Sequence, residues 1–223
     1  TQDSSSAASD VYKRQLQSYS DSVDLSKFGG RFKYSKVLNV IDDVDRAITS
    51  NITRVRIRRN LRALINQEAQ YELCFGNRFH VNSAGFNIKS TGFTIINEPD
   101  ICYLTDIPNA DGRTGALAIV KPIEETGETR IVIGSAGLVD YIKGEVILTT
   151  TLITSTVLND DIIEVQAFPE SNDVVGLKDL YLEFDVSKST INMIKDTISS
   201  GEKISGVGFK VTSSYSNGEL KRG

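Results

Sequence analysis

The chain has no tryptophan, one histidine and two cysteines among its 223 residues, and these shortages exclude several kinds of active site. His80 has no serine or cysteine nucleophile in a recognisable pattern around it. If one strand holds both His80 and Cys74, their side chains lie about 20 Å apart and cannot form a catalytic pair. Gly206 and Gly208 lack the third glycine of a dinucleotide-binding fingerprint. The sequence therefore predicts no enzyme and no cofactor.

Metal-binding and disulfide patterns are also missing. Asp42, Asp43 and Asp45 are predicted to lie within a helix, which does not supply the glycine turn and alternating oxygen ligands of a calcium loop. A solvated acidic face explains them, and we expect no metal. Cys74 and Cys102 are too few for a disulfide framework, so buried free thiols are the main expectation and a disulfide or reactive pair the alternative.

Long apolar runs are absent as well. No stretch approaches the roughly 18 residues that a membrane span requires, and there is no signal peptide. We therefore expect no membrane partner. The chain has four prolines and seventeen glycines, with abundant valine, isoleucine and threonine. This composition indicates a β-rich chain with many turns.

The most informative segment runs from 24 to 59 and reads DLSKFGGRFKYSKVLNVIDDVDRAITSNITRVRIRR. Val37, Ile41, Val44 and Ile48 recur at helical spacing, which predicts one amphipathic helix, with Ser35 as a possible N-cap. After Ser50 and Asn51 the period changes to two. Thr53, Val55 and Ile57 alternate with Arg54, Arg56 and Arg58, which predicts a strand over 51–59 with one half-buried face and one basic face.

The remaining sequence reads as short strands separated by turn residues. A run at 71–75 could form a hairpin with the 51–59 strand. Further strands are predicted at 92–96, 101–104, 116–121, 129–133, 145–153 and 162–168, with mixed texture at 177–185. Asn109–Gly112 has the Asp-Gly signal of a hairpin turn. A short helix over 191–198 and an extended arm, VGFKVTSSY, complete the expected elements.

The tract FGGRFKYSKVLNVIDDVDRAITSNITRVRIRR resembles the J-like baseplate protein family, to which the baseplate wedge subunits of contractile-tailed bacteriophages belong. A second phrase, GSAGLVDYIKGEVILT at 134–149, is similar to the same family. The resemblance extends from about Leu16 to the end. It implies a C-terminal portion of a wedge subunit, which dimerises and joins neighbouring wedges into the baseplate ring.

The first fifteen residues resemble something different. Ser5–Gln15 reads SSAASDVYKRQ, which matches, residue for residue, the translation of a widely used transposase sequencing adapter. We therefore interpret residues 1–15 as a non-native segment, from a gene assembled out of environmental or shotgun reads. We expect the natural protein to have a longer N-terminal part, which this sequence lacks.

The expected fold class is α+β and β-rich: a small α/β core, with a helix on an antiparallel sheet, and an inserted or appended all-β module. The expected division assigns 16–85 and 159–190 to the J-like core, 86–158 to the β-rich module and 191–223 to a C-terminal arm. An arm of this composition is either disordered or laid on a neighbouring protein.

Assembly is the expected function: the chain acts as a virion structural subunit of the tail baseplate, assembled in the host cytoplasm. The candidate interface residues are Arg54, Arg56, Arg58, Phe209 and Val211. The expected partners are a second copy, as a homodimer, and other wedge subunits. A net charge of −4 and the lack of stacking aromatics beside the arginines argue against nucleic acid. A solvated strand face remains the structural alternative, and a carbohydrate- or receptor-binding β-module the functional one.

Overall fold

The computed structural model describes residues 2–21, 25–45, 48, 50–123, 127–194, 215–216 and 219–220. It consists of two units. The first comprises Thr1–Ser9 with Thr190–Gly223, and the second Asp10–Ser189. In the first unit, β12 (Tyr215–Ser216) pairs with β13 (Glu219–Leu220). Helix α1 is assigned to Gln2–Ser20 and includes the adapter-like residues, whose non-native origin stays a prediction.

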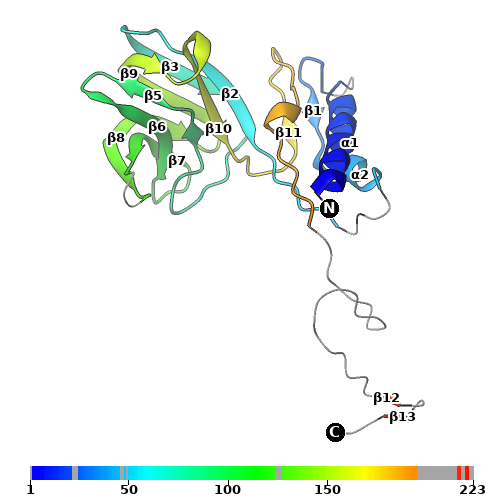
Figure 1. The fold of residues 1–223 in the computed structure, drawn as a ribbon. Coiled ribbons are helices and arrows are strands. Elements are labelled where there is room, and N and C mark those ends of the chain that lie inside the picture. The colour runs from blue at the N-terminus through cyan, green and yellow to red at the C-terminus, as the bar shows by residue number, and fades with distance from the viewer. Residues whose placement is uncertain are drawn as a thin grey trace. The chain divides into compact units, whose positions relative to one another are not determined.

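A closed five-stranded barrel dominates the second unit (Figure 1). Its strands are β5 (Phe93–Ile95), β6 (Glu98–Pro108), β7 (Thr114–Pro122), β8 (Thr129–Asp140) and β9 (Glu145–Thr156). Each strand pairs with the next, and β9 returns to pair with β5. Strand β3 (Glu68–Cys74) adds to the outside of this ring by pairing with β9.

All five pairings of the ring are antiparallel. An odd number of straight strands cannot alternate in direction around a ring, so the strands must bend to close it. Strand β9 pairs with β8 through Glu145–Leu148 and with β5 through Ile153–Thr156, at its two ends. Register shifts interrupt the β5–β9 and β7–β8 ladders. Such bulges increase local twist and bend, which is what closure requires.

A second, three-stranded sheet packs against the barrel. Its central strand β10 (Ile162–Ala167) pairs with β2 (Ile57–Arg62) on one side and with β4 (Lys89–Ser90) on the other. Alternate residues of β10, Ile163, Val165 and Ala167, are buried. They belong to the same hydrophobic cluster as the barrel residues, so the sheet and the barrel share one core.

The helical part of this unit buries a separate small set of residues. Helix α2 (Tyr34–Asp42) follows β1 (Arg31–Phe32), which pairs with β11 (Val174–Val175). The buried apolar residues here are Tyr12, Leu16, Leu25, Phe32, Val37 and Val174. None of them belongs to the cluster under the barrel. The Phe32 ring stacks on Phe184 with centroids 6.1 Å apart.

Buried polar pairs fix the loops around the barrel. The Tyr141 hydroxyl donates to Oδ2 of Asp106 at 2.7 Å, and the Ile88 backbone N–H donates to Oδ1 at 2.7 Å. Asn87 donates to the carbonyls of His80 and Phe168 and accepts from the Phe168 N–H. These bonds satisfy groups whose burial would otherwise cost free energy.

The expected fold class was wrong. The structure is mostly β, with 42% strand and 15% helix, and its centre is the closed barrel rather than a helix on an antiparallel sheet. The physical reason is that α2 buries only Val37, whereas the Val- and Ile-rich strands supply the main core. The expected division into core, module and arm stays a prediction.

Several predicted elements have different bounds or partners. Helix α2 starts after Lys33, so Ser35 is not its N-cap, and it ends at Asp42, before Val44. The 51–59 and 71–75 strands do not pair as a hairpin, because β2 pairs with β10 and β3 with β9. The region 177–185 contains no strand, and of the predicted 191–198 helix the described residues 191–194 are irregular.

Other predictions agree with the structure. The strands expected at 92–96, 101–104, 116–121, 129–133, 145–153 and 162–168 correspond to β5 to β10. The turn predicted at Asn109–Gly112 joins β6 to β7, with Gly112 at a φ of 61°. The Asp111 carboxylate accepts the Arg113 and Thr114 N–H groups, and these bonds lower the pKa of Asp111. No described helix has the length and apolar character needed to cross a membrane.

Candidate interface

The strand predicted over 51–59 forms only in part, because β2 is Ile57–Arg62, but the predicted alternation of exposed and half-buried residues is present along the segment. From Asn51 to Arg58 every second residue is exposed, including Arg54, Arg56 and Arg58, and the residues between them are half-buried. Ladder pairing begins only at Ile57, so Arg54 and Arg56 precede β2 itself. Leu61 fixes which face points inwards, because it is buried in the barrel core. The basic side chains of β2 consequently lie on the outward face.

The antiparallel register places further polar residues on this outward face. Arg58 lies opposite Gln166, and Gln166 lies opposite Lys89 on β4. Directly paired residues project to the same side of a sheet. Arg62, four residues after Arg58, shares that side. We call the exposed outward side of the three-stranded sheet, with the segment that precedes β2, the arginine face. Its basic residues are Arg54, Arg56, Arg58, Arg62 and Lys89, and we include Lys188, whose ammonium contacts Glu164 on this side.

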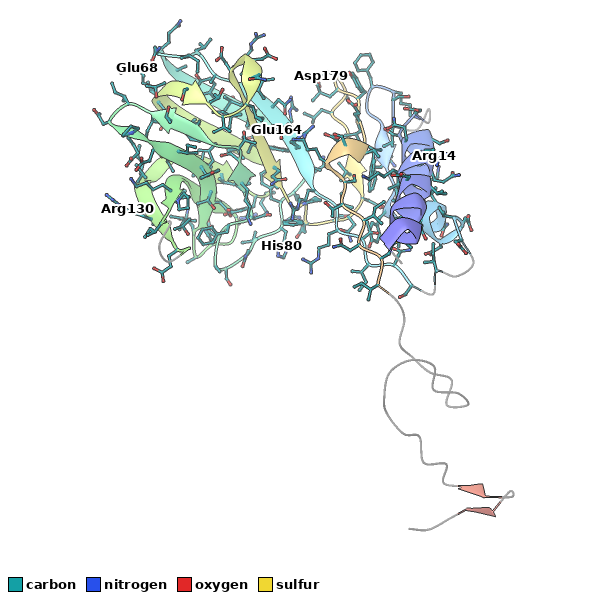
Figure 2. The ribbon with its side chains drawn as sticks, in the orientation of Figure 1. Arg14, Glu68, His80, Arg130, Glu164 and Asp179 are labelled. Atoms are coloured by element: carbon teal, nitrogen blue, oxygen red, sulfur yellow. The ribbon has the colours of Figure 1, made fainter. Side chains whose placement is uncertain are left out.

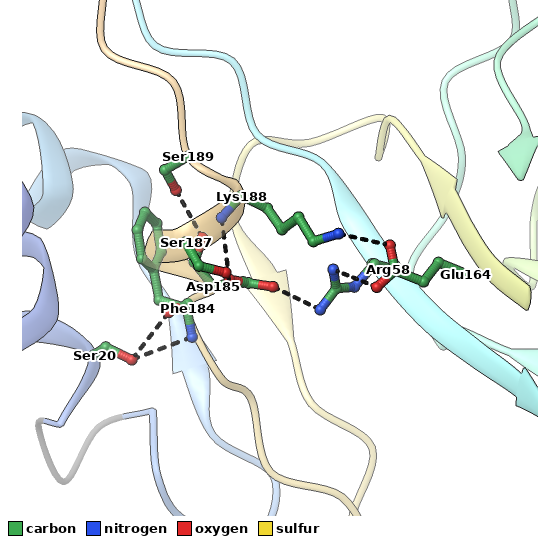
Figure 3. Close-up of polar contacts among 8 residues, drawn as sticks. All are labelled: Ser20, Arg58, Glu164, Phe184, Asp185, Ser187, Lys188 and Ser189. Atoms are coloured by element: carbon green, nitrogen blue, oxygen red, sulfur yellow. Dashed lines mark hydrogen bonds and ion pairs between the residues drawn. The ribbon is translucent and has the colours of Figure 1, made fainter. Parts of the chain in front are cut away.

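Arg58 lies at the centre of an ion-pair network (Figure 3). Its guanidinium contacts the Glu164 carboxylate at 3.1 Å and the Asp185 carboxylate at 2.6 Å. The Lys188 ammonium contacts the second oxygen of Glu164 at 3.3 Å. Both ends of the network come from segments more than a hundred residues from β2 in the chain. Within Asp10–Ser189, this network joins β2 and β10 to the segment that contains η2 (Val186–Lys188).

The electrostatics of Asp185 follow from its contacts. Partial burial alone would raise the pKa of Asp185, but hydrogen bonds from the Ser187 hydroxyl and the Lys188 N–H, together with the Arg58 charge, lower it overall. The carboxylate therefore stays ionised at neutral pH and holds Arg58. Nearby, the Ser20 hydroxyl donates to the Phe184 carbonyl and accepts from the Phe184 N–H (Figure 3).

Arg56 has a different environment. Its guanidinium carbon lies 4.8 Å from the centroid of the Phe168 ring, in cation–π geometry. Arg56, Lys89, Gln166 and Phe168 line a shallow depression on the arginine face. The Phe168 N–H donates to the Asn87 side chain, and the Phe168 carbonyl accepts hydrogen bonds from the Asn87 amide and the His80 N–H. The ring and the cation above it are thus held on a well-bonded loop.

The neighbouring arginine of β2 points the other way. Arg59 is half-buried and donates to the Cys74 carbonyl at 2.6 Å. It ties β2 to the end of β3 and is unavailable to a partner. The alternation of side chains along β2 explains this difference between Arg58 and Arg59, because successive strand residues face opposite sides.

Sequence reasoning missed the acidic partners of Arg58. Glu164 is the one charged residue in the predicted 162–168 strand, and its position among mainly apolar residues could have indicated an ion pair with a basic residue. Asp185 carried no such signal, because its segment has no regular structure before η2. Phe168 was assigned to a strand, but nothing in the sequence placed it under Arg56. The other two predicted interface residues, Phe209 and Val211, lie outside the described residues.

The structure also brings Cys74 near two carboxylates. Oxygens of Glu72 and Glu145 and the Cys74 sulfur lie within 4.8 Å of one another. Burial and the hydrogen bond to Glu72 raise the pKa of the Cys74 thiol, so it stays protonated at neutral pH, whereas a metal ligand must be a thiolate. Cys74 and Cys102 are both free. His80 lies beyond the end of β3, so one strand does not hold both Cys74 and His80, contrary to expectation.

Comparison with protein families gave one result that bears on the arginine face. Residues 1–60 match the family described as baseplate structural protein gp6, C-terminal domain III. This region contains α1, β1 and α2 and ends within β2, so it includes Arg54, Arg56 and Arg58. It confirms the resemblance that the 28–59 tract indicated. A search of curated proteins found no match.

Proposed function

We propose that the chain is a phage baseplate wedge subunit that dimerises and links neighbouring wedges into the baseplate ring, a role supported by the match of residues 1–60 to a baseplate structural protein family. Its role in the baseplate is structural, as the family is. The proposed location is the tail of the virion, with assembly in the cytoplasm of the bacterial host. Contacts with other proteins, rather than chemistry on a substrate, are its means of action.

The observation that carries the proposal is the position of the arginine strand. The family match ends within β2, so its final part is the arginine-bearing segment. Arginine suits subunit contacts because its planar guanidinium pairs carboxylates through two parallel hydrogen bonds. Arg54, Arg56 and Arg62 are exposed and make no ion pair with any described residue. They are therefore available to a neighbouring subunit.

We propose that the dimer contact uses a different surface from the arginine face. Phe209 and Val211 remain proposed interface residues, since an apolar segment near the C-terminus can bury its side chains against a neighbouring copy. Obligate interfaces of this kind bury more than about 2,000 Å² in total. An area of that size requires residues beyond Phe209 and Val211.

Light scattering on the full chain over a concentration series tests the proposal. A mass of twice the monomer that persists on dilution supports dimerisation. Co-purification with the other wedge subunits of the same phage, expressed together, tests the link between wedges. A chain that stays monomeric and joins no wedge subunit overturns the proposed function.

A further inference from the structure

We propose that the arginine face binds an acidic, carboxylate-bearing segment of a different baseplate subunit, rather than the same face of a second copy. This inference rests on the proposed assembly function and names the partner chemistry of one of its surfaces.

The charge on this face is opposite to that of the chain. The arginine face has six basic side chains, and the two acidic side chains in contact with it are Glu164 and Asp185. The whole chain has a net charge of −4. A cationic surface on an acidic protein attracts anionic partners.

The internal acids neutralise only part of this charge. Glu164 and Asp185 pair with Arg58 and Lys188. Arg54, Arg62 and Lys89 form no ion pair with any described residue, and Arg56 contacts an aromatic ring rather than a carboxylate. Four cations therefore remain for a partner, spread over one face of a sheet rather than gathered at one point.

Arg56 and Lys89 are arranged to receive a carboxylate. The Phe168 ring holds the Arg56 guanidinium from one side, and a stacked guanidinium keeps its N–H donors free at its edge. Lys89 and Gln166 line the same shallow depression, mainly with the apolar parts of their side chains, and we propose that their polar ends reach a carboxylate bound above it. A carboxylate there accepts hydrogen bonds from two cations. Charge-assisted bonds of this kind are about twice as strong as neutral ones.

The spacing of the charges favours an extended partner. Residues two apart in a fully extended chain are separated by about 6.6 Å, and the exposure of Arg54, Arg56 and Arg58 alternates with this period from the segment before β2 into β2 itself. The chain contains an example of the matching arrangement, because Glu164 on the adjacent strand reaches Arg58 across the ladder. A strand with acidic residues at alternate positions presents its carboxylates at the same interval.

Self-pairing of this face is disfavoured by symmetry. In a two-fold dimer the same patch contacts itself, so a two-fold axis through the arginine face sets the arginines of one copy against those of the other. Like charges at contact are repulsive. Nucleic acid is the other anionic candidate, but the aromatic side chain on the face, Phe168, already stacks on Arg56, and stacking platforms for bases need open rings.

The test uses the full chain and a peptide of about ten residues with glutamate at alternate positions. Binding is followed by fluorescence anisotropy at low salt. The variant Arg56→Glu with Lys89→Glu is expected to weaken binding about tenfold or more. The matched control, Arg113→Glu with Arg130→Glu, changes the net charge equally at exposed barrel positions; Figure 2 shows Arg130 on the barrel, away from Glu164. The control is expected to bind almost as the unchanged protein does.

Four results overturn the inference: no binding of the peptide, an equal loss in the control, equal binding of a glutamine version of the peptide, or tighter binding of a DNA duplex of about 20 base pairs. Light scattering separates this inference from the proposed function. If the chain joins the wedge and the Arg56, Lys89 variant joins it equally well, only the partner assignment fails. If the unchanged chain neither dimerises nor joins, the proposed function fails first.

Discussion

Replacing Tyr141 by phenylalanine tests whether the buried bond to Asp106 stabilises the barrel. Both side chains are 1% exposed, and the phenol donates to the Asp106 carboxyl at 2.7 Å. Burial and this hydrogen bond raise the pKa of the Tyr141 phenol, so the hydroxyl stays protonated and acts as donor over the whole working range of pH. Tyr141→Phe keeps the ring and removes only this donor.

The expected loss of stability follows from the hydrogen bonds that Asp106 keeps in the Tyr141→Phe variant. Oδ1 of Asp106 keeps the Ile88 N–H, but Oδ2 loses its donor in a site that water does not reach. Leaving a buried acceptor unsatisfied costs about 1–3 kcal/mol, with carboxylates at the upper end. We expect Tyr141→Phe to lower the free energy of unfolding by about 2–3 kcal/mol. For a chain of this size the melting temperature then falls by about 4–12 °C.

Urea unfolding followed by circular dichroism measures the change, and an unaltered slope of the transition shows that the folded state is intact. Tyr181→Phe is the matched control, since Tyr181 is 62% exposed and makes no hydrogen bond with any described residue. The control is expected to lie within about 0.5 kcal/mol of the unchanged protein. Equal stabilities for the two variants would refute the reasoning, because the buried bond would then contribute nothing.

Three further predictions concern the sheet, the barrel and the thiol. In a double-mutant cycle, Arg58→Ala and Asp185→Ala couple by about 0.5–1 kcal/mol at pH 6. Because the folded-state pKa of Asp185 is lowered, this stabilisation is present above the unfolded pKa and is lost as the pH falls through the folded pKa. Urea unfolding at a descending series of acidic pH values checks this loss. Gly137→Ala places a Cβ against a backbone carbonyl of the adjacent strand and should prevent barrel closure, seen as lost soluble expression, whereas Gly134→Ala, with its nearest neighbour 3.7 Å away, should fold normally. Cys74 should react with iodoacetamide at pH 7 more slowly than a free cysteine does, because its pKa is raised; mass spectrometry of the native protein that shows faster labelling would contradict this.

Local sequence patterns predicted exposure and strand positions, but not strand partners. The alternation from Thr53 to Arg58 gave the correct exposed residues, since side-chain direction follows from backbone geometry alone. The partner of β2 lies more than a hundred residues away, at Ile162–Ala167. Nothing in a local pattern selects one distant strand over another, and this is why the expected hairpin and fold class were wrong.

The helix prediction failed for a different reason. Val44 and Ile48 continue the apolar spacing of Val37, yet the helix ends at Asp42. The carboxylates of Asp42, Asp43 and Asp45 are unfavourable at a helix C-terminus, where the macrodipole is negative. Aspartate is also a poor helix former. Weighting these charges against the apolar period would have shortened the predicted helix.

For the candidate interface, the sequence indicated the basic residues and not their neighbours. Arg56 and Arg58 look alike in sequence, but the structure gives one an aromatic ring and the other two carboxylates. Those partners, Phe168, Glu164 and Asp185, come from later segments that only the folded chain brings near. The difference decides which arginine is free for a neighbouring subunit.

The pairing of β2 with β10 also has an evolutionary consequence. Arg62, where β2 ends, lies opposite Ile162, where β10 begins, so the two ends of the intervening segment are adjacent; this segment also supplies β4, the third strand of the sheet. Segments whose ends lie close together are the ones that tolerate replacement or insertion. The family match also stops at residue 60, just before the chain leaves the sheet. A segment that replaces the one between these two strands must therefore supply a partner for β10 in place of β4 and fill the core beneath Leu61 and Ile163.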